Sequence, residues 1–251
     1  IYPGYGFLSE NPELAEACEA NGITFIGPPS GVLRSAGNKV TAKEQAIAAG
    51  VPVLRSTPPT TDIDALLAGA DDIGFPVFAK AVAGGGGRGM RRVERKADLK
   101  RALEEAMREA RSAFGDATMF LEQAVLRPRH IEVQVLADAS GETVHLFERD
   151  CSVQRRNQKL IEESPSPAVT PAQRARMSEL AVRAAQQLGY VGVGTLEFLL
   201  DDQGNFYFME MNVRLQVEHT VTEALTSIDL VKWQIRTVAG IPLNFTQSEV
   251  P

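Results

Sequence analysis

Residues 194–212 have the sequence GTLEFLLDDQGNFYFMEMN, in which two apolar segments are joined by the turn dipeptide Gln203-Gly204. A glycine-containing connection between two β-prone segments is typical of a β-hairpin. Two earlier segments, HIEVQVLAD (130–138) and ETVHLFERD (142–150), are also strand-like. We therefore predict that the second half of the chain forms antiparallel strands.

A helix is predicted within this region, and its end signals are strong. Thr170 can cap it, Pro171 can occupy its first position, Gln173 completes a capping box and Gly189 ends it. A last helix is predicted over about 227–239.

The first half of the chain has a different pattern. A helix capped by Asn11 should precede a short buried strand at 23–27, and a second helix should span 34–50. From about 51 to 121, the strand-like segments VPVL, FPVFAKA and MFLE are separated by two helices, the second over about 96–111 with one apolar stripe. This βαβαβ-like stretch is predicted to form a small separate subdomain.

Composition excludes several classes of protein. The 251 residues carry a formal net charge of −6, which argues against general affinity for nucleic acid or an anionic membrane. No apolar run is long enough to span a membrane. Two cysteines, Cys18 and Cys151, cannot form a disulfide framework, so a reducing cytoplasmic location is expected. Basic residues nevertheless cluster beside a glycine-rich loop, which indicates a small anionic ligand.

That loop follows Lys80 and contains four consecutive glycines at 84–87. Glycines let backbone N–H groups approach phosphate oxygens, and the lysine adds charge. The loop is not a Walker A motif, because no GK[ST] closes it. It is either a mobile surface loop or a phosphate-binding lid, and the upstream lysine favours the lid.

Two acidic residues on the predicted hairpin indicate a metal site. Glu197 and Glu210 interrupt apolar strands, so both should lie on partly buried surface, where like charges require a cation. With the amide of Asn212 they form a hard oxygen set suited to magnesium. Alternatively, both acids pair with arginine or lysine.

The next segment, RLQVEH (214–219), places Arg214, Gln216 and Glu218 at alternate positions. In an extended chain they would share one face, where arginine could hold a small oxyanion and glutamate could take its proton. A solvated charged face explains the spacing equally well. His219 is more simply structural. In CSVQRRNQK (151–159), Lys159 could contact an anion. The arginines of this stretch are more simply interpreted as exposed on the surface or paired with Glu162 and Glu163.

Taken in series, five motifs resemble the biotin carboxylase family of ATP-grasp ligases. They are YPGYGFLSEN, KAVAGGGGRGM, RPRHIEVQVLAD, ERDCSVQRRNQK and EMNVRLQVEHTVTE. The resemblance implies a mixed α/β (α+β) ATP-grasp fold with a mobile glycine-rich lid, preceded by the end of a Rossmann-like domain. It also implies a truncated catalytic unit, because family members have further segments at both ends.

The implied domains are residues 1–33 (end of the N-terminal domain), 34–51 (helical linker), 52–121 (lid) and 122–251 (second ATP-grasp half). The implied reaction uses ATP and Mg²⁺ or Mn²⁺ to convert bicarbonate to carboxyphosphate, which carboxylates biotin on a carrier domain. The implied partners are that carrier, a carboxyltransferase present as a domain or a separate chain, and a second copy of the chain.

The resemblance assigns site residues by motif. For the nucleotide it implies Lys39, Lys80, Gly84, Gly85, Gly86, Gly87, Met90, Glu122, Gln123, Val125, His130 and Gln154. For the metal it implies Glu197, Glu210 and Asn212. For bicarbonate and biotin it implies Lys159, Arg214, Gln216, Val217 and Glu218, with Glu218 as the base.

Three positions depart from common family residues. Asn157 replaces a frequent histidine, Gln123 a frequent lysine and Thr220 a frequent proline. The departures at 157 and 123 put nucleotide affinity in question. The carboxyl acceptor stays open: Trp233 and AGIPL (239–243) resemble acyl-CoA carboxylases, Thr220 resembles pyruvate carboxylases and Asn157 resembles urea carboxylases. We favour acyl-CoA. Another ATP-grasp ligase or a non-catalytic assembly module is a weaker alternative.

Overall fold

A computed structural model describes residues 1–83, 89–156 and 158–251. The chain divides into two compact units. Unit 1 consists of residues 1–37, 41–53 and 128–251, and unit 2 of residues 38–40 and 54–127. In the described part of the chain, no helix is long and apolar enough to cross a membrane.

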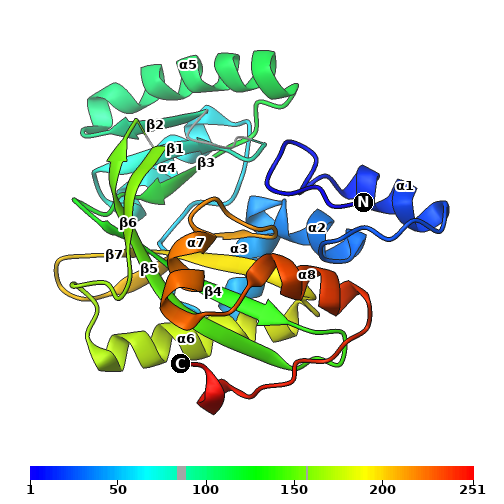
Figure 1. The fold of residues 1–251 in the computed structure, drawn as a ribbon. Coiled ribbons are helices and arrows are strands. Elements are labelled where there is room, and N and C mark those ends of the chain that lie inside the picture. Colours follow the sequence, from blue (N-terminus) through cyan, green and yellow to red (C-terminus); the bar gives the residue numbers. More distant parts are fainter. Residues whose placement is uncertain (84–88, 157) are drawn as a thin grey trace. The chain divides into compact units, whose positions relative to one another are not determined.

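Unit 1 is built on a five-stranded antiparallel sheet with strand order β6-β5-β4-β7-β8 (Figure 1). The four predicted strands and the hairpin at Gly204 are confirmed. The fifth strand, β6, was not predicted because it lies at the sheet edge, where four of its six residues are exposed and apolar alternation is lost. The strands are β4 (Arg129–Ala137), β5 (Thr143–Arg155), β6 (Gln158–Glu163), β7 (Gly192–Leu200) and β8 (Phe206–Asn212).

The predicted helix after the sheet's first three strands is confirmed as α6 (Pro171–Gln187). Its capping box joins Thr170 and Gln173, and Gly189 has a left-handed φ of 61° just beyond its end. The predicted last helix is shorter, α8 (Leu230–Val238), and a further helix, α7 (His219–Thr226), precedes it. A 3₁₀ turn, Gln247–Glu249, follows.

The N-terminal part of unit 1 contains one confirmed element and two corrections. Asn11 caps α1 (Pro12–Ala20), its Oδ1 accepting from Leu14 N at 2.7 Å. Residues 23–27 are not a strand, because only scattered backbone bonds to Ile1 replace a strand ladder. The single helix predicted over 34–50 is two helices, α2 (Ser30–Ala36) and α3 (Lys39–Ala48), interrupted at residues 37–38.

The two faces of the five-stranded sheet differ in composition. On one face, alternate residues of β4 such as Ile131, Val133 and Val135 pack against α6 in the main core. On the other face, a smaller core at one end of the sheet joins Leu136 and Val193 to the α8 region. The rest of that second face carries polar and charged side chains.

Unit 2 contains a three-stranded antiparallel sheet, order β2-β1-β3, and two helices. The predicted strands FPVFAKA and MFLE and both helices are confirmed, and the predicted stripe packs Leu99, Leu103, Ala106 and Ala110 into the core. VPVL (51–54) forms only a bridge at Val53, and β2 replaces it in the sheet. The elements are α4 (Ile63–Ile73), β1 (Val77–Ala81), β2 (Met90–Val93), α5 (Lys96–Phe114) and β3 (Met119–Gln123).

Candidate active site

A row of charged residues crosses the polar face of the unit 1 sheet. Arg149 on β5 pairs in register with Glu132 on β4, Glu132 with Glu197 on β7, and Glu197 with Glu210 on β8. Because residues directly opposite in adjacent strands lie close together on one face, the register itself assembles this row. The neighbouring row contains Gln134, Thr195 and Asn212.

Glu197 lies at the centre of this face and is 2% exposed. Its Oε1 accepts hydrogen bonds from Lys159 Nζ at 3.0 Å, Asn212 Nδ2 at 2.6 Å and Gln216 Nε2 at 2.7 Å. A buried carboxylate needs such partners, because desolvation otherwise makes its charge costly. Three elements that are separate in sequence therefore meet at one carboxylate.

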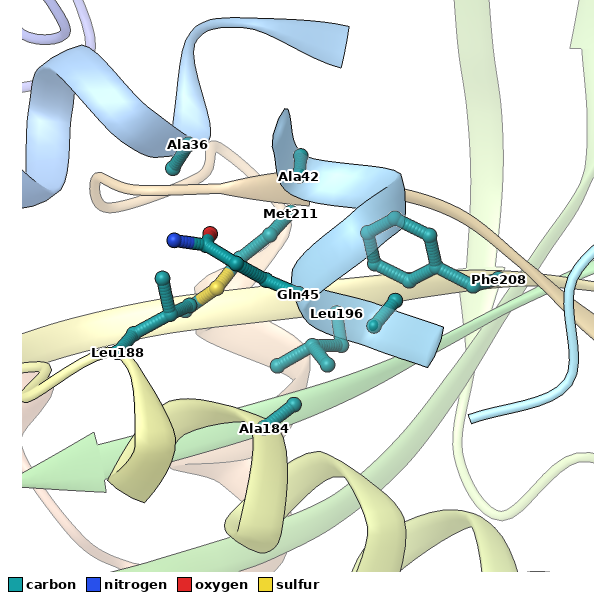
Figure 2. A pocket seen from close by; sticks show the side chains of 9 residues that line it. Ala36, Ala42, Gln45, Ala184, Leu188, Leu196, Phe208 and Met211 are labelled. Atoms are coloured by element: carbon teal, nitrogen blue, oxygen red, sulfur yellow. The ribbon is translucent and has the colours of Figure 1, made fainter. Parts of the chain in front are cut away.

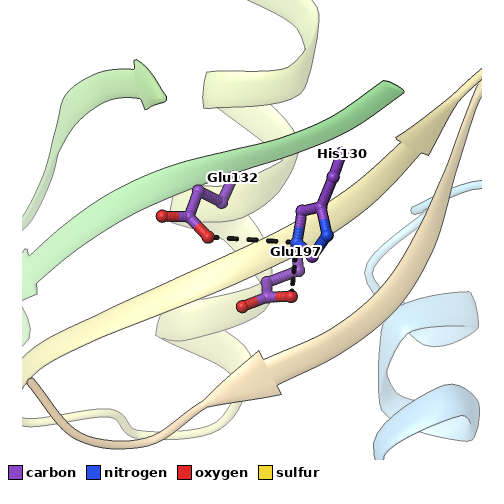
Figure 3. Close-up of side chains that lie close together, drawn as sticks. All are labelled: His130, Glu132 and Glu197. Atoms are coloured by element: carbon purple, nitrogen blue, oxygen red, sulfur yellow. Dashed lines mark ion pairs between the residues drawn. The ribbon is translucent and has the colours of Figure 1, made fainter. Parts of the chain in front are cut away.

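His130 occupies the other side of Glu197. Its Nε2 lies 2.6 Å from Glu197 Oε2 and 3.9 Å from Glu132 Oε2 (Figure 3). This short contact makes His130 and Glu197 an ion pair when the imidazole is protonated. The ring's Nδ1 is 3.0 Å from Gln154 Nε2. The two residues predicted to contact nucleotide in unit 1, His130 and Gln154, are thus neighbours.

Lys159 on β6 is surrounded by three carboxylates. Its Nζ donates to Glu132 Oε2, to Glu197 Oε1 at 3.0 Å and to Glu218 Oε1 at 2.5 Å. The Lys159 side chain is therefore mostly shielded from solvent, with 19% of it exposed. Arg155, the last residue of β5, is exposed, in agreement with the surface interpretation of the arginines.

The segment 213–218 does not form the extended strand expected for RLQVEH, because it turns at residues 217–218 into α7. The alternate residues consequently have separate partners: Arg214 donates to Asn212 Oδ1 at 3.1 Å, Gln216 to Glu197, and Glu218 accepts from Lys159. Val217 is 60% exposed.

His219, the first residue of α7, is structural as predicted. Its Nδ1 is 2.7 Å from the carbonyl oxygen of Gln216, which ties the start of the helix back to the preceding segment.

Burial and ion pairing shift the pKa values of the ionisable groups on this face in opposite directions. Burial alone raises the pKa of Glu197 and of Glu218, but the neighbouring cations outweigh it and hold both pKa values below the ordinary range. Burial alone lowers the pKa of His130 and Lys159, but the carboxylates outweigh it and raise both. Each of the four shifts therefore favours the charged form of its group.

The structure brings the predicted metal ligands together. Glu197 and Asn212 are in contact, and Glu210 lies opposite Glu197 in the register of β7 and β8. Glu210 was predicted to be partly buried, but it is exposed on β8, an edge strand of the sheet. Carboxylate and amide oxygens are donors that Mg²⁺ prefers, so the set fits that ion chemically. The carboxylate of Glu197 that would bind the ion also forms an ion pair with Lys159.

The predicted nucleotide residues of unit 2 lie on or beside its sheet. Lys80 on β1 forms an ion pair with Glu122 on β3, and both side chains are largely buried. Met90 begins β2 directly opposite Lys80. Gln123 accepts from Arg55 Nε at 3.3 Å, and Val125 is half-buried after β3.

Some predicted positions lie outside what the structure describes. These are Gly84, Gly85, Gly86, Gly87 and Asn157, together with the side chain of Lys39 at the start of α3.

Glu132, Gln134 and Arg149 belong to the polar face but were not predicted as site residues. All three are at most 1% exposed. A signal was present in HIEVQVLAD, where His130, Glu132 and Gln134 occupy alternate positions of a strand whose other positions are apolar. Polar residues at every second position of a buried strand indicate a polar network on that face.

A narrow apolar hollow lies on the opposite face of the sheet (Figure 2). Leu196 and Met211 reach it from the strands that carry Glu197 and Asn212 on the polar face. Its lining contains no charged group, so this hollow is unsuited to an anionic ligand. The remaining lining residues are Ala36, Ala42, Gln45, Ala46, Ala184, Leu188 and Phe208.

Two family models match the chain. The model described as carbamoyl-phosphate synthase L chain, ATP binding domain, matches residues 38–246, and that described as biotin carboxylase, N-terminal domain, matches residues 1–33. Among relatives, the alpha chain of mitochondrial methylcrotonoyl-CoA carboxylase from Mus musculus is 54% identical over all of this chain and 35% of its own length. A pyruvate carboxylase chain from Methanothermobacter thermautotrophicus is 53% identical over all of this chain and 51% of its own.

Solved structures are equally similar. The biotin carboxylase domain of Hydrogenobacter thermophilus 2-oxoglutarate carboxylase, in complex with MgADP, ADP and bicarbonate, has a TM-score of 0.96 and 49% identity, covering all of this chain and 55% of its own. Campylobacter jejuni biotin carboxylase has a TM-score of 0.96 and 47% identity, covering all of this chain and 56% of its own. The chain thus spans about half the length of these proteins.

Proposed function

The chain belongs to the biotin carboxylase family and has its ATP-grasp fold, and we propose that it performs the ATP-dependent carboxylation of carrier-bound biotin by bicarbonate. The match of residues 1–33 to a biotin carboxylase segment favours this reaction over carbamoyl phosphate synthesis. The polar face argues against a non-catalytic assembly module, since the charged groups that are costly to bury are intact.

The observation that carries the proposal is the contact of Lys159 with Glu218, at 2.5 Å, in a network that also holds Glu197 and Gln216. A lysine beside a carboxylate can bind a small oxyanion while the carboxylate takes a proton from it. Bicarbonate is such an anion and is a poor nucleophile until deprotonated. The similar Hydrogenobacter thermophilus structure contains bicarbonate together with MgADP.

Each residue then has a distinct role. Glu218, whose pKa Lys159 holds low despite burial, is ionised at neutral pH and accepts the proton of bicarbonate. Arg214 presents a planar fork that aligns the anion, and Gln216 and Val217 contact bicarbonate or biotin. Alignment of the anion with the transferred phosphoryl group supplies much of the rate.

For the nucleotide, we propose that Lys39 and Lys80 contact the phosphates of ATP and that Glu122, Gln123 and Val125 contact the adenine. We propose His130, Gln154, Met90 and the glycines at 84–87 as further nucleotide-binding residues. Glu197, Glu210 and Asn212 would hold Mg²⁺ or Mn²⁺, which would neutralise part of the phosphate charge.

For the acceptor of the carboxyl group, we propose acyl-CoA, on the basis of Trp233 and AGIPL. Similarity alone does not decide, because the methylcrotonoyl-CoA and pyruvate carboxylase relatives are 54% and 53% identical. We also propose a biotin carboxyl carrier, a carboxyltransferase and a second copy of the chain as partners. The Hydrogenobacter thermophilus domain is a dimer.

We propose that the protein is cytoplasmic. Both cysteines are buried and free, in keeping with a reducing compartment such as the cytoplasm. Relatives are named mitochondrial or chloroplastic as well as bacterial, so the proposal of a cytoplasmic protein needs its own localisation experiment.

The test uses the complete carboxylase. Release of ADP should require bicarbonate and rise with free biotin, and labelled bicarbonate should enter acid-stable product with acyl-CoA. Pyruvate, 2-oxoglutarate and urea are the alternative acceptors, and incorporation with one of them alone would replace the acyl-CoA proposal. ADP release that is independent of bicarbonate would contradict the carboxylase proposal itself.

A further inference from the structure

Arg149 is the largest fully buried side chain among the described residues of the chain, with an exposed fraction of 0%. Removing a guanidinium from water is costly unless its charge and its N–H groups are satisfied. A hydrophobic residue at this point of β5 would avoid that cost. An arginine can therefore be buried here only if its N–H groups find acceptors.

Each of the five guanidinium N–H groups of Arg149 has an acceptor, which is the maximum for this side chain. The acceptors come from β4, β7, the segment 213–218 and α7. They are Glu132 Oε1 (2.6 Å), Gln134 Oε1 (2.7 Å), Thr195 Oγ1 (3.4 Å), Gln216 Oε1 (2.9 Å) and Thr222 Oγ1 (2.7 Å).

Two of these acceptors also form hydrogen bonds with residues of the proposed bicarbonate site. The carboxylate of Glu132 uses one oxygen for Arg149 and the other for Lys159. The amide of Gln216 accepts from Arg149 at one end and donates to Glu197 at the other. Both groups are thereby fixed in orientation by Arg149, whereas among the described residues no hydrogen bond or ion pair joins Arg149 directly to Lys159 or Glu218.

We propose that Arg149 is a positioning residue for the bicarbonate reaction: through Glu132 and Gln216 it sets the positions of Lys159 and of the segment carrying Glu218. Lysine at this position keeps the charge but has three donors without the planar fork, so it cannot hold both acceptors in the same geometry. This inference rests on the proposed function.

The structure offers a matched pair of variants that leave Arg149 in place. Thr222 and Thr226 lie one turn apart on α7 and are each 1% exposed. Thr222 Oγ1 accepts from Arg149, whereas Thr226 Oγ1 donates to the carbonyl of Thr222 and accepts from Ile228 N, and in the described part of the chain no bond joins it to Arg149. Thr222→Val and Thr226→Val make the same chemical change, but only the first removes a contact of Arg149.

The experiment measures bicarbonate-dependent ADP release by the complete carboxylase, with nucleotide affinity determined separately by equilibrium binding. Arg149→Lys should lower kcat/KM for bicarbonate by about 10²-fold, the effect of a misplacement of roughly 1 Å, with nucleotide affinity nearly unchanged. Thr222→Val should lower it by about tenfold, the loss of one hydrogen bond to a charged group. Thr226→Val should match the wild type.

If Arg149→Lys does not fold, the two threonine variants decide alone. The positioning role would be overturned if Arg149→Lys and Thr222→Val both responded to bicarbonate as the wild type does. If the lysine variant is unfolded, a wild-type response of Thr222→Val alone would overturn it. So would an equal loss in the two threonine variants, which would show a general effect of α7 stability. A wild-type enzyme without bicarbonate-dependent activity would instead overturn the proposed function, and this result is read before any variant is compared.

Discussion

The same strands of unit 1 form two faces with opposite chemistry. On β4, Ile131, Val133 and Val135 pack into an apolar core against α6. His130 and Glu132, at the alternate positions of the same strand, belong to a network of charges on the other face. Apolar contacts are non-directional, so that face tolerates substitutions that keep volume. On the charged face each group has specific partners, and the loss of one partner leaves a buried charge.

This difference in composition indicates that the apolar and the charged face contribute differently to the stability of the sheet. Buried ion pairs add little stability compared with well-packed apolar residues, because desolvation offsets their attraction. The apolar face therefore supplies most of the stability of the sheet. The charged face is retained at an energetic cost, and we assign that cost to its chemistry.

The largest effect is expected from Glu218→Gln on the charged face. Removal of a general base lowers rate by roughly 10²–10⁴-fold, and we expect a loss in this range at saturating ATP. Bicarbonate-dependent ADP release measures it. Glu163→Gln, an exposed acid on β6, is the control and should behave as the wild type. Similar losses of activity in both variants would show that the effect is not specific to Glu218.

On the apolar face, Leu196→Ala should act in the opposite way. Leu196 is 0% exposed and belongs to the main core, so its truncation should destabilise the fold by about 2–5 kcal/mol. Thermal unfolding measures this change. KM for bicarbonate should stay near the wild-type value in the folded fraction, although Glu197 is the next residue. A selective loss of bicarbonate response with unchanged stability would show that the faces are not separable.

Lys159→Met should alter how stability depends on pH. In the wild type, Lys159 overcomes burial and keeps the pKa of Glu218 below 4.5, so the stabilisation from Glu218 is present above pH 4.5 and is lost as the pH falls through the lowered value. Without the lysine, burial is less opposed and the pKa rises. The stability of the variant relative to wild type should then increase as the pH is lowered from 7 to 5.

Urea unfolding at several pH values tests this expectation. The difference between the two curves cancels groups remote from Lys159, whereas Glu197, which also contacts the lysine, contributes in the same direction as Glu218. Curves that stay parallel from pH 7 to pH 5 would show that Lys159 does not control the ionisation of these carboxylates.

The smallest effect is expected at the cap of α6, the helix that covers the apolar face. Thr170→Ala removes the capping box with Gln173 and should cost about 1 kcal/mol. Amide exchange in the first turn of α6 should become faster, while bicarbonate kinetics are unchanged. Exchange rates equal to those of the wild type would show that the cap adds no local stability.

Much of the fold was predictable because local signals agreed with it. The helix α6 has a complete set of end signals, and four strands have clear alternation. The edge strand β6 lacks that alternation because most of it is exposed. The short strand expected at 23–27 was wrong because apolar composition does not provide a pairing partner.

For the site, motifs in the sequence identified groups that the structure brings together, such as Lys159, Gln216 and Glu218. They did not reveal how these groups are connected. The extended arrangement expected for RLQVEH failed because the chain turns into α7, and Arg149 was overlooked because its five acceptors come from four separate segments. Such a network depends on strand register and helix placement, which single motifs do not encode.

The most direct test of the central claim, that Arg214 and Glu218 belong to a bicarbonate site rather than to the nucleotide pocket, is the bicarbonate titration of Arg214→Lys in the complete carboxylase. Lysine keeps the charge but loses the planar fork. The account predicts a strongly impaired response to bicarbonate in biotin-stimulated ADP release, with ATP affinity nearly intact when measured by equilibrium binding. A variant that loses ATP affinity and keeps a normal bicarbonate response would contradict it and would assign Arg214 to the nucleotide pocket.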